Sequence, residues 1–205
     1  MPTQKQKHAV DLYASLMEEA KARLDSITYT LNGDTGLPEI FADEFCTLQL
    51  RMLCEVIALG CLVAHGDIQE THTRRLSQVY AADKICERLE ALHPDFYPRP
   101  VRQVEPDPPR NFGIEDITTG YLTKPELIEL VTKKCGPGLH RGTTKDLGLK
   151  SLDPEEIYAY TIKIRTLLDI HWFTLTTGEP HYLCSMNGGV GGTVGVEFLR
   201  KGRNG

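Results

Sequence analysis

Apolar side chains recur along most of this chain with the period of a helix. Residues 5 to 27 place them at every third or fourth position, which predicts a helix with one buried face. Residues 39 to 65 are apolar on nearly all sides, so we expect a central helix surrounded by neighbours. The same periodicity, bounded by proline, glycine and capping residues, predicts further helices over residues 68 to 92, 124 to 134 and 154 to 169.

After residue 170 the pattern changes to that of strands. Residues 171 to 176, 182 to 186 and 193 to 199 are short and rich in β-branched or aromatic groups, with turn residues between them. They predict an antiparallel β-meander. We expect Trp172 to seal this sheet against the helices, and the glycine-rich run at 188 to 195 to be a mobile hairpin loop.

An extended segment separates the third and fourth predicted helices. Residues 94 to 110 carry six prolines, which a regular helix does not tolerate, so we expect a strap across the surface. The predicted fold class is α+β, mainly α, with a bundle of about five helices and a small C-terminal antiparallel β-meander. We expect a single domain, in which residues 1 to 170 form the bundle and residues 171 to 200 form the sheet packed on it.

Composition excludes several classes of protein. Of the 205 residues, 40% are hydrophobic and 25% are charged, which is typical of a folded globular protein and not of collagen or a disordered chain. The net charge of −5 gives no general electrostatic attraction for nucleic acid, although it leaves room for a local basic patch. The N-terminal residues lack the apolar core of a secretory signal, so we expect a cytoplasmic protein.

The apolar helices raise the questions of disulfides and of a membrane. The six cysteines lie mostly within helical pattern and form no C-x-x-C pair, so we expect buried free thiols. Residues 45 to 64 are long enough to cross a bilayer, but Arg51 and Glu55 would each cost about 2.5 to 3.5 kcal/mol near its centre. We therefore expect a buried helix and no membrane association.

Arg51 and Glu55 are the first candidate for a site. They lie four residues apart on the predicted central helix, and His65 falls on nearly the same face. Because an unpaired charge among apolar neighbours is costly, the two must pair, bind other polar groups or line a cleft. Two interpretations stay open: an ion pair that fixes the helix, or a site in which the guanidinium binds an anion such as phosphate.

The second candidate is the glycine-rich corner that follows the helix predicted over residues 124 to 134. Gly136 and Gly138 expose backbone amides there, and His140 and Arg141 come directly afterwards. Histidine can act as an acid or a base near neutral pH, and arginine can stabilise developing negative charge. The alternative is that His140 only caps or packs against the corner.

Two short motifs carry a resemblance to known proteins. L-Q-L-R-M-L-C-E-V-I-A-L, over residues 48 to 59, and C-G-P-G-L-H, over residues 135 to 140, resemble uncharacterised bacterial helical proteins. More remotely, the chain is similar to HEPN-type helical bundles, several of which act in defence systems or toxin pairs as metal-independent RNases. The resemblance implies a helical bundle. The R-x(4 to 6)-H motif of catalytic HEPN proteins is not found at His140, because Lys133 and Lys134 occupy the preceding helix turns.

These observations predict a polar focus in which Arg51 and Glu55 lie close to the corner at His140. We expect it to serve a HEPN-like binding or interaction module whose ligand is a nucleotide, an RNA end or a partner protein. The alternative is a metal-independent endoribonuclease or phosphodiesterase, with His140 as acid or base and Arg141 or Arg51 on the phosphate. A third interpretation is an oligomeric scaffold, since an apolar central helix favours a homodimer. No metal or cofactor is predicted.

Overall fold

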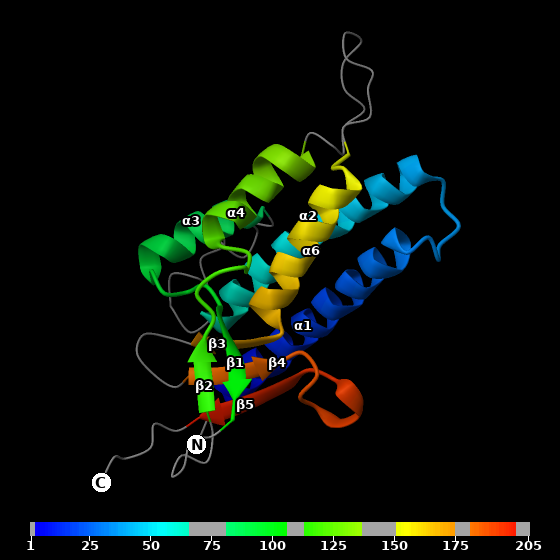
Figure 1. The fold of residues 1–205 in the computed structure, drawn as a ribbon. Coiled ribbons are helices and arrows are strands. Elements are labelled where there is room, and N and C mark those ends of the chain that lie inside the picture. Colours follow the sequence, from blue (N-terminus) through cyan, green and yellow to red (C-terminus); the bar gives the residue numbers. More distant parts are fainter. Residues whose placement is uncertain (1–2, 66–80, 106–112, 137–150, 175–180, 200–205) are drawn as a thin grey trace.

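The computed structural model describes residues 3–65, 81–105, 113–136, 151–174 and 181–199, and helices dominate it (Figure 1). The helices are α1 (Gln4–Leu31), α2 (Glu39–Ala64), α3 (Ala82–Leu92), α4 (Lys124–Glu129), which continues into the π-helix η2 (Leu130–Cys135), and α6 (Pro154–Leu168). The strands are β1 (Arg99–Val104), β2 (Gly113–Asp116), β3 (Ile170–Thr174), β4 (His181–Ser185) and β5 (Gly195–Leu199), with the 3-10 turn η3 (Val190–Gly192) before β5. The predicted class, α+β and mainly α, is confirmed. Of the third predicted helix, residues 68 to 80 lie outside the described residues.

α1 and α2 lie side by side and form the largest helical contact of the bundle (Figure 1). α1 begins at a capping box, in which Thr3 Oγ1 accepts from the Gln6 amide at 3.2 Å and Gln6 Oε1 accepts from the Thr3 amide at 2.8 Å. Gly60 of α2 brings the two backbones together, because a Cβ there would lie 3.3 Å from the side chains of Met17 and Tyr13. The glycine therefore sets how closely the helices pack.

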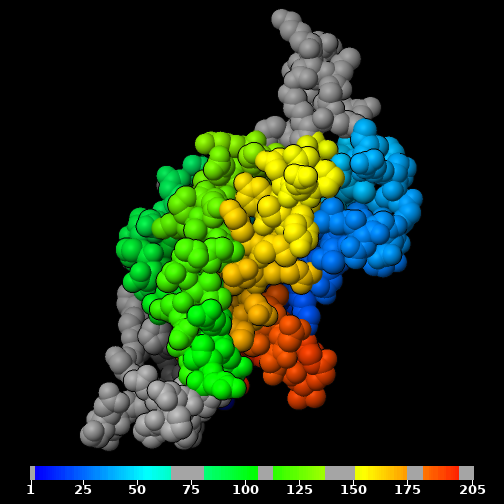
Figure 2. All heavy atoms as spheres, viewed as in Figure 1, coloured from blue at the N-terminus to red at the C-terminus, as the bar shows by residue number. Residues whose placement is uncertain are grey.

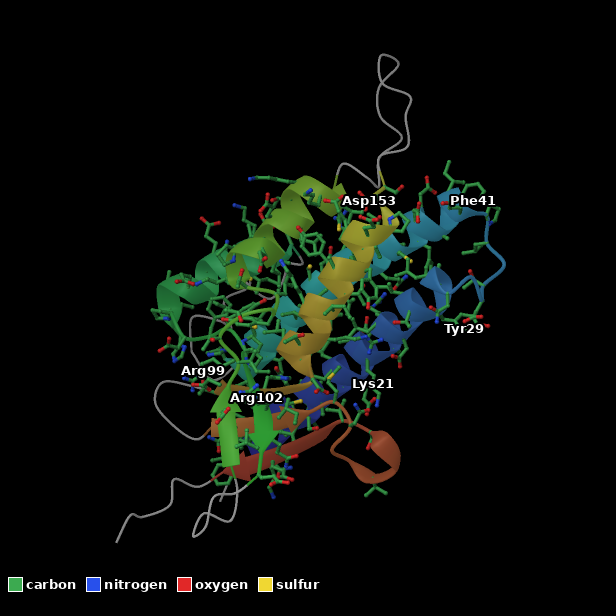
Figure 3. All side chains as sticks on the ribbon, in the orientation of Figure 1. Lys21, Tyr29, Phe41, Arg99, Arg102 and Asp153 are labelled. Carbon is green, nitrogen blue, oxygen red and sulfur yellow. The ribbon has the colours of Figure 1, made fainter. Side chains whose placement is uncertain are left out.

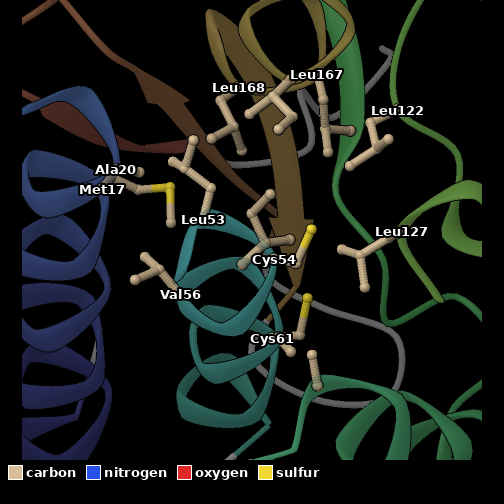
Figure 4. Packing of buried hydrophobic residues seen from close by; sticks show 14 of the residues in the cluster. Met17, Ala20, Leu53, Cys54, Val56, Cys61, Leu122, Leu127, Leu167 and Leu168 are labelled. Atoms are coloured by element: carbon tan, nitrogen blue, oxygen red, sulfur yellow. The ribbon is translucent and has the colours of Figure 1, made fainter. Parts of the chain in front are cut away.

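α2 is the central helix that its all-round apolar pattern predicts. It contacts α1, α3, η2 and α6, and Figure 4 shows Leu53, Cys54 and Val56 among side chains from several of these elements. Among the described residues, α2 alone is long and apolar enough to cross a membrane, with a mean hydropathy of 1.7 in a window that is 56% buried inside the protein. All six cysteines are buried free thiols, as predicted.

The sheet is larger than the predicted meander. Its strand order is β2-β1-β3-β4-β5, and every neighbouring pair is antiparallel. Two strands come from residues 99 to 116, so part of the proline-rich strap, Arg99–Val104, is a strand and not only a surface connector. Pro100 pairs with His171 near the end of the β1–β3 ladder, where its missing N–H costs one hydrogen bond at most.

The sheet faces the helices through side chains other than the one predicted. His171 and Phe173 are buried, and the Phe173 ring stacks on Tyr13 of α1 with centroids 3.9 Å apart. Because side chains alternate along a strand, Trp172 points to the opposite face of the sheet. The expectation that Trp172 seals the sheet against the helices is wrong, and His171 and Phe173 fill that position.

α6 packs against β1 of the strap and against the helices α1 and α2. Asp153 caps its first turn by accepting from the Glu156 amide at 2.8 Å. The Leu122 amide donates to the Lys163 carbonyl at 2.9 Å. Lys163 also binds Glu126, which closes the capping box of α4 with Thr123. α6 thus lies against both α4 and α1, with its C-terminus leading directly into β3.

Candidate functional site

Arg51 and Glu55 form an ion pair, which is the first of the two interpretations that the sequence leaves open. Arg51 Nε donates to Glu55 Oε1 at 3.2 Å, and the two side chains are 35% and 17% exposed. The pair is therefore partly open to solvent, which lowers the cost of keeping two charges on an apolar helix. Among the described residues, the two Nη groups of Arg51 make no further hydrogen bond.

Segment 137–150 contains the rest of the glycine-rich corner, and the chain on either side of this segment lies on the part of α2 that carries Arg51. At one end, the Arg51 charge is close enough to lower the pKa of Cys135, although burial dominates and raises that pKa to about 12. At the other end, the Leu152 amide donates to Thr47 Oγ1 at 3.2 Å, one turn before Arg51. Gly136, at the first end, is the C-cap of η2.

The remaining corner residues named by the sequence, Gly138, His140 and Arg141, lie outside the described residues. His140 follows Gly136 by four residues, a reach of about 14 Å at full extension. The structure thus brings Arg51, Glu55 and Gly136 to one region of the molecule, and the placement of His140 beside them stays a prediction.

His65 lies elsewhere. Fourteen residues separate it from Arg51, a rise of about 21 Å along α2. It is fully buried, its Nδ1 donates to the Cys61 carbonyl at 2.7 Å, and its ring lies 4.9 Å from that of His93. Burial lowers the pKa of His65, against a raising effect of the Cys61 carbonyl. His65 is therefore part of the core where α2 and α3 end, and it does not lie beside Arg51 and Glu55.

A pocket of about 500 Å³ opens between α1, the C-terminal half of α6 and the turn after β4. Figure 2 shows the face on which α1 in blue, α6 in yellow to orange and the orange-red C-terminal segment meet. The lining residues share a mixed character, with an apolar floor and a charged rim: Lys21, Leu24, Asp25, Ile162, Arg165, Thr166, Leu168, Asp169, Met186 and Asn187.

Lys21 fixes the turn that closes one side of the pocket. Its ammonium donates to the Met186 carbonyl at 3.1 Å, to Asn187 Oδ1 at 2.7 Å and to the Gly192 carbonyl. Lys21 points from α1 toward this turn (Figure 3). One turn earlier on α1, Glu18 Oε1 accepts from the Val194 amide at 2.6 Å. The glycine-rich loop expected to be mobile is therefore held on α1 at several points.

Arg165 forms the opposite wall of the pocket. Its Nη2 donates to Asp25 Oδ1 at 3.1 Å and to Thr28 Oγ1 at 3.0 Å, which fixes the guanidinium against α1. Among the described residues, its Nε and Nη1 groups make no hydrogen bond. Asp169 lies one turn further along α6, at its C-cap, and its backbone carbonyl accepts from the Met186 amide at 2.9 Å.

Family models, curated proteins and solved structures offer no match to this chain. The chemistry of the two locations must therefore be argued from their own residues. The sequence contains one weak signal of the pocket, since Lys21 and Asp25 on α1, and Arg165 and Asp169 on α6, are pairs four residues apart that share a helix face. Nothing in the sequence brings these two faces together with Met186.

Proposed function

We propose that this protein is a binding module that holds a small molecule in the pocket between α1 and α6. The observation that carries the proposal is the Arg165 guanidinium, held by Asp25 and Thr28 at the wall of a cavity with an apolar floor. Its volume of about 500 Å³ lies within the range of small-ligand sites. A guanidinium fixed by two partners loses little freedom when it binds a ligand, which favours affinity.

The polar groups of this pocket are suited to recognition. Lys21 and Asn187 are engaged with each other at the rim, and the Thr166 hydroxyl donates to the Ile162 carbonyl at 3.0 Å. These bonds fix the shape of the wall. Leu24, Leu168 and Met186 are buried beneath the pocket, and Ile162, which is 42% exposed, offers apolar surface to the non-polar part of a ligand.

Chemical shift mapping on the backbone amides of the protein tests this proposal. The uniformly ¹⁵N-labelled protein is titrated with mixtures of carboxylic acids, amines, amino acids and nucleoside monophosphates. We expect at least one mixture to shift the backbone amides of Leu24, Thr166 and Asn187, and expect a T166F variant, which fills the pocket, to abolish that shift. Shifts confined to other regions, or shifts that persist in T166F, would overturn the proposal.

A second candidate function, the HEPN-like contact with RNA, is favoured by the region around Arg51. The Nη groups of Arg51 can donate to a phosphate, and both ends of the segment that carries His140 lie on the same stretch of α2. We propose that this region contacts RNA through Arg51. R51M is expected to weaken the retention of labelled single-stranded RNA, with R102M as the control, because Arg102 also forms an exposed ion pair.

The ribonuclease alternative is tested in the same preparation. Incubation with total RNA in the presence of a chelator separates metal-independent cleavage by this protein from contaminating nucleases when H140A and R141A are assayed beside the native chain. Loss of cleavage in both variants would support catalysis at the corner. Identical cleavage by all three proteins would remove the enzyme from consideration.

The predicted homodimer and cytoplasmic location stay predictions. The described surface exposes several large apolar side chains near the α1–α2 connection, among them Tyr29 at 55% and Phe41 at 54% (Figure 3). Light scattering at two protein concentrations tests the homodimer and the scaffold interpretation. Fractionation of cells into soluble and membrane material tests the location, since the length and hydropathy of α2 alone do not decide it.

A further inference from the structure

Only some of the charged side chains that line the α1–α6 pocket form ion pairs with one another. Asp25 neutralises Arg165 directly. Lys21, in contrast, is bound to three neutral oxygens, two backbone carbonyls and the Asn187 amide oxygen. Among the described residues, the Asp169 carboxylate accepts no hydrogen bond and forms no ion pair. One positive and one negative charge therefore line the same cavity without a counterion from the described chain.

Asp169 stands where the helix itself favours a cation. As the C-cap of α6, it lies at the end where the backbone carbonyls concentrate partial negative charge. A carboxylate is disfavoured there, whereas a cation would be attracted by both the carboxylate and the helix end. Asp169 is also exposed, so an ammonium group of a ligand can reach it without displacing another residue.

The anion-binding side lies one turn away on the same helix. Arg165 Nε and Nη1 remain available, and the charge of Lys21 adds to the positive potential of that wall. Side chains four residues apart on a helix have Cβ atoms about 5 to 6 Å from each other. A ligand that carries a carboxylate and an ammonium on the same carbon atom can therefore bind Arg165 with one and Asp169 with the other.

We propose that the pocket binds a small zwitterion with an apolar body, of which an α-amino acid with an aliphatic side chain is the simplest member. This inference rests on the proposed binding function and names its ligand class. The carboxylate binds Arg165, the ammonium binds Asp169, and the aliphatic part lies against the exposed side chain of Ile162. Each charge of the ligand then meets an opposite charge of the protein, and the apolar part leaves water.

Three matched probes test the inference by isothermal titration calorimetry. L-Leucine has both charges, 4-methylpentanoate has the same carbon skeleton without the ammonium, and isopentylamine has the ammonium without the carboxylate. We expect leucine to bind most tightly. Each of the other two probes is expected to bind with an affinity at least about tenfold lower, because each lacks one charge-assisted hydrogen bond.

Variants assign each charge to its residue. D169N is expected to lower the affinity for leucine about tenfold and to leave the affinity for 4-methylpentanoate unchanged. R165Q is expected to lower both affinities. E115Q is the matched control for loss of an exposed carboxylate, since Glu115 pairs with Arg102 on the sheet, away from the pocket. Its affinity for leucine is expected to equal that of the native protein.

The possible outcomes separate the inference from the function on which it rests. Equal affinities for leucine and 4-methylpentanoate, unchanged in D169N, would overturn the proposal of a zwitterionic ligand and would leave a module that binds carboxylates. Failure of all three probes to bind would also overturn the proposal of a zwitterionic ligand. The binding function would then stand or fall by whether other compounds shift the pocket amides and lose that effect in T166F.

Discussion

Tyr13 Oη donates a hydrogen bond to His171 Nε2 at 2.7 Å, joining α1 to β3 in the centre of the molecule. The direction follows from the other ring nitrogen. His171 Nδ1 lies 2.9 Å from the Leu168 carbonyl, which can only accept, so Nδ1 carries the proton and Nε2 accepts from the tyrosine. Both side chains are almost completely buried. The pair therefore specifies one neutral tautomer in the core.

This buried histidine makes stability depend on pH. Burial lowers the pKa of His171 from 6.5 to about 4, against a raising effect of the Leu168 carbonyl. Between these values the unfolded chain binds the proton and the folded protein does not, so stability is complete above pH 6.5 and falls as the pH drops toward 4. The expected loss is about 3 kcal/mol, measured by urea unfolding at pH 7.5, 6, 5 and 4.

A substitution separates His171 from other groups that titrate in this range. Burial also lowers the pKa of His65, so the native slope includes both histidines. H171Q removes one of them, and its stability is expected to vary less with pH than that of the native protein. An unchanged slope in H171Q would show that His171 does not govern acid sensitivity.

Removal of the tyrosine hydroxyl tests the hydrogen bond itself. Y13F leaves His171 Nε2 buried without its donor, and we expect it to reduce the free energy of unfolding by about 1 to 3 kcal/mol. Y29F removes the same atom from an exposed position on the same helix and is expected to change stability by less than about 0.5 kcal/mol. Chemical denaturation of both variants at pH 7 measures the difference, and equal effects would contradict a structural role for the bond.

The burial of α2 predicts a strong contrast between two of its leucines. Leu50 is fully buried, whereas Leu48 is 40% exposed. L50A leaves a cavity and is expected to cost about 2 to 5 kcal/mol, and L48A less than about 1 kcal/mol. Thermal or urea unfolding of the purified variants checks the prediction. A larger cost for L48A would mean that this face of α2 is covered, as in a homodimer.

Glu126 connects the start of α4 with α6. Its carboxylate accepts from the Thr123 amide at 2.9 Å and from Lys163 Nζ at 2.5 Å. Burial alone would raise the pKa of Glu126, but the hydrogen bonds from Lys163 and Thr123 outweigh it and lower the pKa to about 2. This contribution to stability is present above pH 4.5 and is lost as the pH falls through about 2.

Two variants divide the role of Glu126. E126Q keeps an acceptor for the Thr123 amide and loses the charge, whereas E126A loses both. We expect a cost of about 1 to 2 kcal/mol for E126A at pH 7 and about half of that for E126Q, since the ion pair is partly exposed. The difference between native protein and E126Q should shrink as the pH approaches 2. A difference that stays constant with pH would contradict the assigned charge effect.

Local pattern predicted the elements well where period and capping residues agree. Asp153 followed by proline indicated the start of α6, and Asp153 does cap that helix. The all-round apolar character of residues 39 to 65 predicted a central helix, and α2 occupies that place. The pattern did not predict β1 within the strap, because the prolines there argue against a strand. A proline is compatible with a strand when the missing N–H falls at the end of a ladder, as at Pro100.

The sequence by itself determined the helical bundle and the free buried thiols, and it placed Arg51 and Glu55 on one helix face where they can pair, because each depends on residues close together along the chain. Only the tertiary structure decided that His171 and Phe173, and not Trp172, face the helices, since alternation along a strand fixes two faces without saying which is covered. It also decided that Lys21, Arg165 and Met186 line one pocket. These residues are far apart in the chain, and only the packing of α1, α6 and the turn after β4 brings them together.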